Sequence, residues 1–189
     1  MRYGLIALFV GMVSAQWLVP LKMIYDGEQV VSNGTVYKFK TRPVDPSDPF
    51  RGKYITLNFE VDGIADTTSY ESGELINIIF ENDSAGYARP LVAQKETPSE
   101  GPYLQTTVTY SSRDDSEHPM VFFNLPFDRF YLEESKASEA ERLSWQSRQD
   151  STQITYGIVH IGSGRAVLTD VMINDKSIAK IVEEGRSEP

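Results

Sequence analysis

The sequence predicts a mainly β protein, an antiparallel β-sandwich or open barrel with one covering α-helix, preceded by an N-terminal transmembrane helix. Three observations carry this prediction. A run of nineteen residues near the N-terminus, 3–21, is almost wholly apolar. About eight short segments then alternate apolar and polar residues or are rich in β-branched residues, with turn signals between them. A single later segment has helical composition, and nothing alternates as β-α-β-α, which disfavours a parallel sheet.

The apolar segment 3–21 is predicted to be a membrane anchor. As a helix it is long enough to cross a hydrocarbon core of about 30 Å. Trp17 and Lys22 stand where interface anchors stand. A cleaved signal peptide is the alternative, since residues 13–15 (Val-Ser-Ala) form a small-residue cleavage site. We prefer the anchor because apolar residues continue past that site to Ile24.

The β-strands are expected from residue 35 onward. They lie, in chain order, at 35–41, 54–61, 74–82, 86–94, 103–111, 119–127, 152–162 and 164–174. In the first strand Tyr37 and Phe39 share one face. In the second strand four apolar residues share the face that we take as the core face: Ile55, Leu57, Phe59 and Val61. Pro90 predicts an edge strand or a bulge, and the Gly-Ser-Gly sequence at 162–164 predicts a hairpin turn.

The covering helix is expected at 132–149, which is rich in Glu, Ala, Lys, Gln and Arg. Ser138, followed three residues later by Glu141, fits a capping box at its start. We expect this helix to lie over a sheet or over the open end of a barrel. The resulting organisation has three regions: 1–29, a membrane anchor (or signal peptide) and connector; 30–182, one β domain; and 183–189, a frayed tail.

Composition excludes several classes of site and partner. The chain has no cysteine, so disulfides and thiolate metal sites are impossible, and its two histidines are not at metal-ligand spacing. The net charge is −9, and the charges of residues 1–29 cancel, so the predicted β domain and its tail carry all of the net charge. An acidic domain repels phosphate backbones, which argues against nucleic acid as a partner. No G-x-S-x-G, H-E-x-x-H or P-loop pattern occurs, and we expect no metal, cofactor or catalytic residue.

The stretch 42–59, RPVDPSDPFRGKYITLNF, is the most unusual part of the chain. Its prolines fix φ and keep the preceding residues out of helical conformation, so the stretch is predicted to be a rigid corner between two strands. That structural role is one interpretation. The other is that Asp45, Asp48 and Arg51 present a fixed polar surface to a partner. A calcium site at the two aspartates falls short of the six to eight oxygen ligands that the ion takes.

A second candidate lies in FDRFYLEE, residues 127–134. Strand alternation places Arg129 and Tyr131 on one face. We hypothesise that these two side chains lie near the corner that runs from Arg51 to Tyr54 and form a shared polar patch with it. The alternative is an internal salt bridge from Arg129 or Arg51 to a nearby glutamate, which would close the domain.

Residues 52–59, GKYITLNF, resemble the defining motif of the GDYXXLXY protein family. Gly52, Tyr54 and Leu57 match the motif, whereas Lys53 stands in place of its acidic residue and Phe59 in place of its last tyrosine. The segment 126–141 resembles a later block of the family, and the last hairpin resembles its C-terminal end. The resemblance covers most of the chain. It implies an envelope protein tied to a multi-spanning inner-membrane protein of a bacterium.

The expected function is therefore that of a single-pass inner-membrane protein whose periplasmic β domain is an accessory or interaction module for an integral membrane partner. The alternative is a ligand-binding β module for a small molecule or cell-wall glycan. A third reading, a hydrolase like signal peptidase, would need a serine such as Ser32 beside a buried lysine. The candidate interaction residues are Asp45, Asp48, Arg51, Gly52, Tyr54, Leu57, Arg129, Tyr131, Glu133 and Glu134.

Overall fold

The computed structural model describes residues 2–42, 54–112, 119–132 and 153–187. Two helices lie in these residues, α1 (Arg2–Asn33) and α3 (Ile178–Ser187). The strands of the described residues are β1 (Thr35–Lys40), β2 (Tyr54–Thr56), β3 (Gly63–Ala65), β4 (Leu75–Asn82), β5 (Ala88–Gln94), β6 (Leu104–Ser111), β7 (Met120–Phe123), β8 (Arg129–Tyr131), β9 (Thr155–Gly162), β10 (Arg165–Ile173) and β11 (Lys176–Ser177). The covering helix expected at 132–149 falls, after Leu132, outside the described residues.

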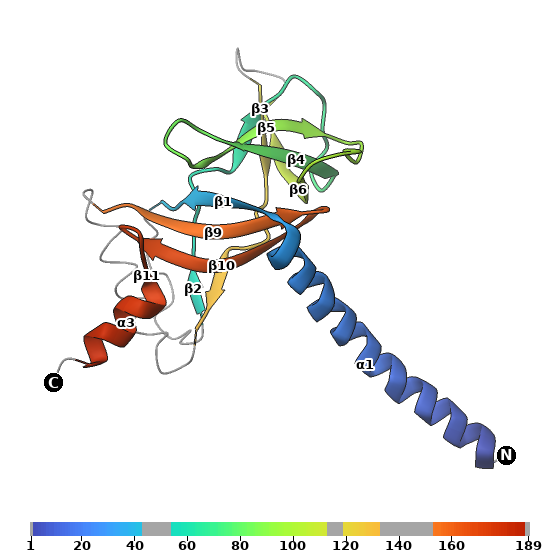
Figure 1. The fold of residues 1–189 in the computed structure, drawn as a ribbon. Helices are drawn as coiled ribbons and strands as arrows, with labels where there is room; N and C mark the ends of the chain where they lie inside the picture. Colours follow the sequence, from blue (N-terminus) through green and yellow to red (C-terminus); the bar gives the residue numbers. More distant parts are fainter. Residues whose placement is uncertain (1, 43–53, 113–118, 133–152, 188–189) are drawn as a thin grey trace.

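The strands form a near-closed antiparallel barrel, as the sequence predicted. One sheet has the order β1-β9-β10-β11, a second has the order β3-β7-β6-β4-β5, and β2 and β8 form a separate two-stranded ribbon. Figure 1 shows the five-stranded sheet stacked on the sheet that contains β1, β9 and β10. Two isolated bridges add to these sheets: Thr41, directly after β1, pairs with Phe59, and Leu104 of β6 pairs with Gly164 of the β9–β10 turn.

Phenylalanine rings fill the centre of the barrel. Phe39 is fully buried, and its ring lies 5.1 Å from those of Phe80 and Phe127 and 5.9 Å from that of Phe59. These edge-on contacts are a geometry that aromatic pairs prefer. The burial of Tyr37, Phe39, Ile55, Leu57 and Phe59 confirms the predicted alternation, and Val61 is partly buried.

Turn chemistry also agrees with the prediction. Ser163 and Gly164, with φ of 51° and 82°, connect β9 to β10 as the expected hairpin. Pro90 lies in β5, the edge strand of the five-stranded sheet, and the register between β4 and β5 shifts beside it. An edge strand has no neighbour on its outer side, so the N–H that proline lacks is not needed for a hydrogen bond to another strand there.

Helix α1 is one continuous element of 32 residues, or about 48 Å at 1.5 Å per residue. It is the one helix among the described residues that is long and apolar enough to cross a membrane, with a mean hydropathy of 1.8 over its best window. A signal sequence near an N-terminus satisfies the same criterion. Figure 1 shows α1 leaving the β domain and projecting away from the five-stranded sheet. The large apolar side chains of α1 up to Tyr25 are exposed.

Helix α3 was not predicted from the sequence, which indicated a frayed tail at 183–189. A tight turn precedes the helix, since Asn174 and Asp175 have φ of 47° and 65° and lead from β10 into β11. The helix follows because Ile178 and Val182, one turn apart, are fully buried in the core. Tertiary burial of one apolar stripe therefore stabilises a segment too short to be helical alone.

Candidate functional site

The ribbon β2–β8 brings the two sequence motifs together. Tyr54 pairs with Tyr131, Ile55 with Phe130 and Thr56 with Arg129 in antiparallel register. The N–H of Leu57 donates to the carbonyl of Asp128 at 2.7 Å, which extends the pairing by one residue. Backbone hydrogen bonds therefore fix which side chains of the two motifs lie opposite one another.

The outward face of this ribbon carries the side chains of Tyr54, Thr56, Arg129 and Tyr131. We call the two tyrosines and Arg129 the Tyr-Arg patch. The tyrosine rings lie 5.5 Å apart, and the Arg129 guanidinium lies 5.1 Å from the centre of the Tyr54 ring. Both distances fall in the range of aromatic and cation–π attraction. Tyr131 is 65% exposed and the Arg129 side chain 50% exposed, so solvent reaches the patch.

The charge of Arg129 is only weakly satisfied by the described residues. Its described ion pair is with its neighbour Asp128, at 3.9 Å, and both side chains are at least half exposed. Such pairs contribute little to stability. The internal salt bridge considered above would need a glutamate, and Glu133 and Glu134 lie outside the described residues.

Leu57 does not belong to this surface. It is 3% exposed and lies in the hydrophobic core, and Phe130 packs against that core from the inward face of β8. Its burial gives no support to the prediction that it contacts a partner, because strand alternation sends Leu57 inward. Its role is to hold the ribbon on the barrel.

The two ends of the proline-rich stretch are fastened to each other. The Arg42 N–H donates to Asn58 O at 2.7 Å, and its guanidinium donates to the carbonyls of Phe59 and Glu60, each at 2.9 Å. The same guanidinium pairs with Asp62 at 2.5 Å. Residues 43–53 between these ends, with the predicted Asp45, Asp48, Arg51 and Gly52, lie outside the described residues.

A cluster of tyrosines and lysines lies near the start of β9. The Tyr156 hydroxyl donates to Asp175 Oδ1 at 2.5 Å, and burial and this carboxylate raise the pKa of Tyr156 above its usual value. The Lys38 and Lys40 ammonium groups lie over the rings of Tyr156 and Tyr87. These contacts are typical of packing on a strand surface.

Two constellations that would indicate chemistry are not formed by the described residues. They contain no group of three or more His, Asp or Glu side chains placed to hold a metal ion. Ser32 is exposed on helix α1, while the lysines nearest in sequence, Lys38 and Lys40, lie over tyrosine rings. The described residues therefore give no support to a serine–lysine hydrolase.

Sequence reasoning missed a polar cluster at the base of α1. Asp26 Oδ2 lies 2.7 Å from Lys22 Nζ and 2.6 Å from an Arg165 Nη. The i, i+4 spacing of Lys22 and Asp26 is a visible signal of the first pair. The contribution of Arg165 comes from the β9–β10 hairpin and has no local signal.

Comparison with known proteins gives one match. A family described as GDYXXLXY protein matches residues 16–171, which is most of the chain and includes both strands of the ribbon and the base of α1. No curated protein and no solved structure matches the chain.

Proposed function

The chain belongs to the GDYXXLXY protein family, and we propose that it is a membrane-anchored accessory module that docks on a multi-spanning protein of a bacterial inner membrane. In this proposal α1 spans the bilayer once and the β domain lies in the periplasm. The length and mean hydropathy of α1 support the span. The family is of unknown function, so the proposal depends on the geometry of this chain.

The observation that carries the proposal is the exposed Tyr-Arg patch. Tyrosine and arginine are enriched at the few positions that dominate the energy of protein interfaces. Each tyrosine ring offers a large apolar area with few rotatable bonds, so little conformational entropy is lost when a partner covers it. The β2–β8 ladder already holds these side chains in place, which lowers the cost of binding further.

The position of the patch also favours a membrane partner. In Figure 1 the ribbon β2–β8 lies on the side of β10 opposite the five-stranded sheet, and α1 projects away from that same sheet. The ribbon therefore belongs to the half of the domain nearer the membrane when α1 is embedded. A protein that crosses the bilayer beside α1 can reach this half.

The alternative of a ligand-binding β module is less well supported. A barrel that binds a small molecule in its interior keeps a cavity there. Here the interior is occupied by the packed rings of Phe39, Phe59, Phe80 and Phe127.

The test is to purify the tagged full chain from native membranes in mild detergent and identify the proteins that accompany it. We expect one multi-spanning protein at near-equal amount. Arg129→Ala or Tyr131→Ala should remove a hot-spot contact and weaken the complex by at least about 30-fold, the equivalent of about 2 kcal/mol. Neither change should lower the melting temperature, because exposed side chains of this kind contribute within about 0.5 kcal/mol.

Tyr110→Ala is the matched control. Tyr110 is 60% exposed and stacks on Phe122 with ring centres 6.2 Å apart. The substitution Tyr110→Ala therefore removes a comparable aromatic pair from the five-stranded sheet. It should leave the partner bound. Retention of the partner by both patch variants, or equal loss with Tyr110→Ala, would contradict the proposal. Unfolding of Arg129→Ala would instead identify the patch as a structural element.

A further inference from the structure

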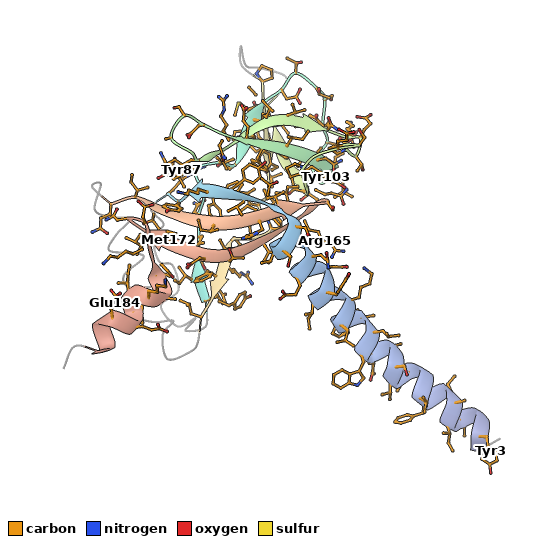
Figure 2. The ribbon with its side chains drawn as sticks, in the orientation of Figure 1. Tyr3, Tyr87, Tyr103, Arg165, Met172 and Glu184 are labelled. Carbon is orange, nitrogen blue, oxygen red and sulfur yellow. The ribbon has the colours of Figure 1, made fainter. Side chains whose placement is uncertain are left out.

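The last turns of α1 are packed on the β domain and do not form a loose tether. Val30 is buried, and the Gly34 N–H donates to Val30 O at 2.8 Å where the helix ends. Asp26 is joined to Arg165 of the hairpin at 2.6 Å. Figure 2 shows Arg165 where α1 meets the hairpin and Tyr3 at the far end of the helix.

A cavity of about 370 Å³ lies in this joint. One wall is a stripe of α1 side chains spaced by three or four residues, from Lys22 to Asn33, and the other wall is the tip of the β9–β10 hairpin, 162–165. This volume is within the range of small-ligand sites, about 300–1,000 Å³. The Lys22 end of the cavity follows directly after the apolar run that ends at Leu21.

The position of the cavity along α1 sets its depth relative to the membrane. When the apolar run occupies the hydrocarbon core, Lys22 and Asp26 lie in the layer of lipid headgroups. The far end of the cavity, at Gly34, lies about 18 Å further along the helix axis, at 1.5 Å for each of twelve residues. A lipid in the adjacent leaflet can thus place its headgroup in the cavity while its acyl chains stay beside α1.

The charges in the cavity suit a phosphate group. Lys22 and Arg165 face one carboxylate, Asp26, so the cluster has a net charge of +1 in a domain that is strongly acidic. Both described ion pairs use the same carboxylate oxygen, Oδ2. Arg165 is 55% exposed, and among the described residues its remaining N–H groups have no other partner. A guanidinium presents these donors in the fork that phosphate oxygens accept.

We propose that the joint between α1 and the β9–β10 hairpin is a binding site for the phosphate of a phospholipid headgroup, held by Arg165 and Lys22. This inference uses the membrane anchor of the proposed function but not its protein partner. The lipid would occupy the space between the helix and the hairpin and so strengthen the joint. The shared chemistry is a phosphate, which free inorganic phosphate also carries.

The test measures lipid binding by the purified full chain, without partner, in native mass spectrometry. Dioleoyl phosphatidylglycerol should bind more tightly than dioleoylglycerol, which has the same chains and no phosphate. Arg165→Gln and Lys22→Gln should each weaken phosphatidylglycerol binding about five-fold, the effect of one cation near a membrane surface. Lys22 is an exposed helix residue outside the β domain, so its removal cannot unfold that domain.

Arg89→Gln is the matched control, because Arg89 is also an exposed arginine in a 2.6 Å ion pair, with Glu81, but lies in the five-stranded sheet. Its affinity for the lipid should stay within two-fold of wild type. Unchanged binding by Arg165→Gln and Lys22→Gln, or equal binding of dioleoylglycerol, would overturn the proposal. Inorganic phosphate that displaces the lipid at equal concentration would identify a site for free anions instead. Flotation with membranes is measured in parallel: a chain that does not float contradicts the anchor itself.

Discussion

The joint at Gly34 allows the sharpest test of the structure, because a single methyl group should break it. A Cβ at residue 34 would overlap the carbonyl oxygen of Val30 and lie 3.0 Å from the carbonyl oxygen of Ile161 in β9. Both neighbours are backbone atoms, which cannot rotate aside. In Gly34→Ala, therefore, the backbone at the end of α1 must change conformation and shift relative to β9.

The size of the effect follows from these contacts. Ordinary Cβ contacts lie at 3.4–4 Å, so the new methyl must move several tenths of an ångström from the Ile161 oxygen and further still from the Val30 oxygen. Inserting a methyl into a packed site of this kind costs about 1–3 kcal/mol. For a chain of this size, 1 kcal/mol corresponds to about 2–4 °C in melting temperature. We expect Gly34→Ala to lower the melting temperature by about 2–12 °C in detergent.

The control substitution is at Gly27, earlier in the same helix. A Cβ at Gly27 of α1 meets no atom within 4 Å, so Gly27→Ala should stabilise the helix by up to about 1 kcal/mol. The natural chain has no cysteine, so spin labels can be attached at exposed Glu28 and Leu91 without background. Pulsed electron paramagnetic resonance should give one narrow distance in wild type and Gly27→Ala and a broader distribution in Gly34→Ala. An equally narrow distribution and an unchanged melting temperature in Gly34→Ala would refute a rigid joint.

Two further predictions concern the barrel. Phe39→Ala should destabilise the domain by about 3–5 kcal/mol because it removes the ring at the centre of the phenylalanine cluster. Val36→Ala, on the exposed face of β1, should change the unfolding free energy by less than about 0.5 kcal/mol. Equal melting temperatures of the two variants in circular dichroism would contradict the filled core. Burial, and then the Asp175 carboxylate, raise the pKa of Tyr156, so its contribution to stability is complete below the ordinary tyrosine pKa of about 10 and is lost as the pH rises through the folded-state value. The absorbance titration of wild type minus Tyr156→Phe should show no phenolate near pH 10, and ionisation there in the folded protein would show that Tyr156 is accessible.

The parts of the fold that local pattern controls could be predicted from the sequence. Tyr37 and Phe39 point inward because alternate side chains of a strand face opposite sides, and this needs no knowledge of the neighbours. The hairpin at 162–164 could be predicted because glycine tolerates the positive φ that the turn requires. Helix α3 could not, since its stability depends on a core surface supplied by distant strands.

In the candidate site, too, the features set by local pattern could be predicted and those set by distant residues could not. Alternation alone predicted that Arg129 and Tyr131 share one face, and the structure shows that this face is exposed. Their proximity to Tyr54 depends on pairing between two strands far apart in the sequence, so the sequence could offer it only as a hypothesis. The structure shows this pairing, with Tyr54 opposite Tyr131. Arg165 at the base of α1 could not be found because its partner, Asp26, belongs to a helix whose packing against the hairpin has no sequence pattern of its own.

The joint between α1 and the β domain fixes the orientation of the Tyr-Arg patch relative to the membrane-spanning helix. A membrane partner presents its docking surface at a fixed height and angle relative to the bilayer. A domain on a flexible tether would lose rotational freedom when it docks, and that loss weakens binding. Because α1 is packed on β9 and β10, the ribbon β2–β8 is already held in one orientation to the helix axis. Gly34→Ala should therefore weaken retention of the partner although residue 34 does not touch the patch, and the lipid in the joint should strengthen it.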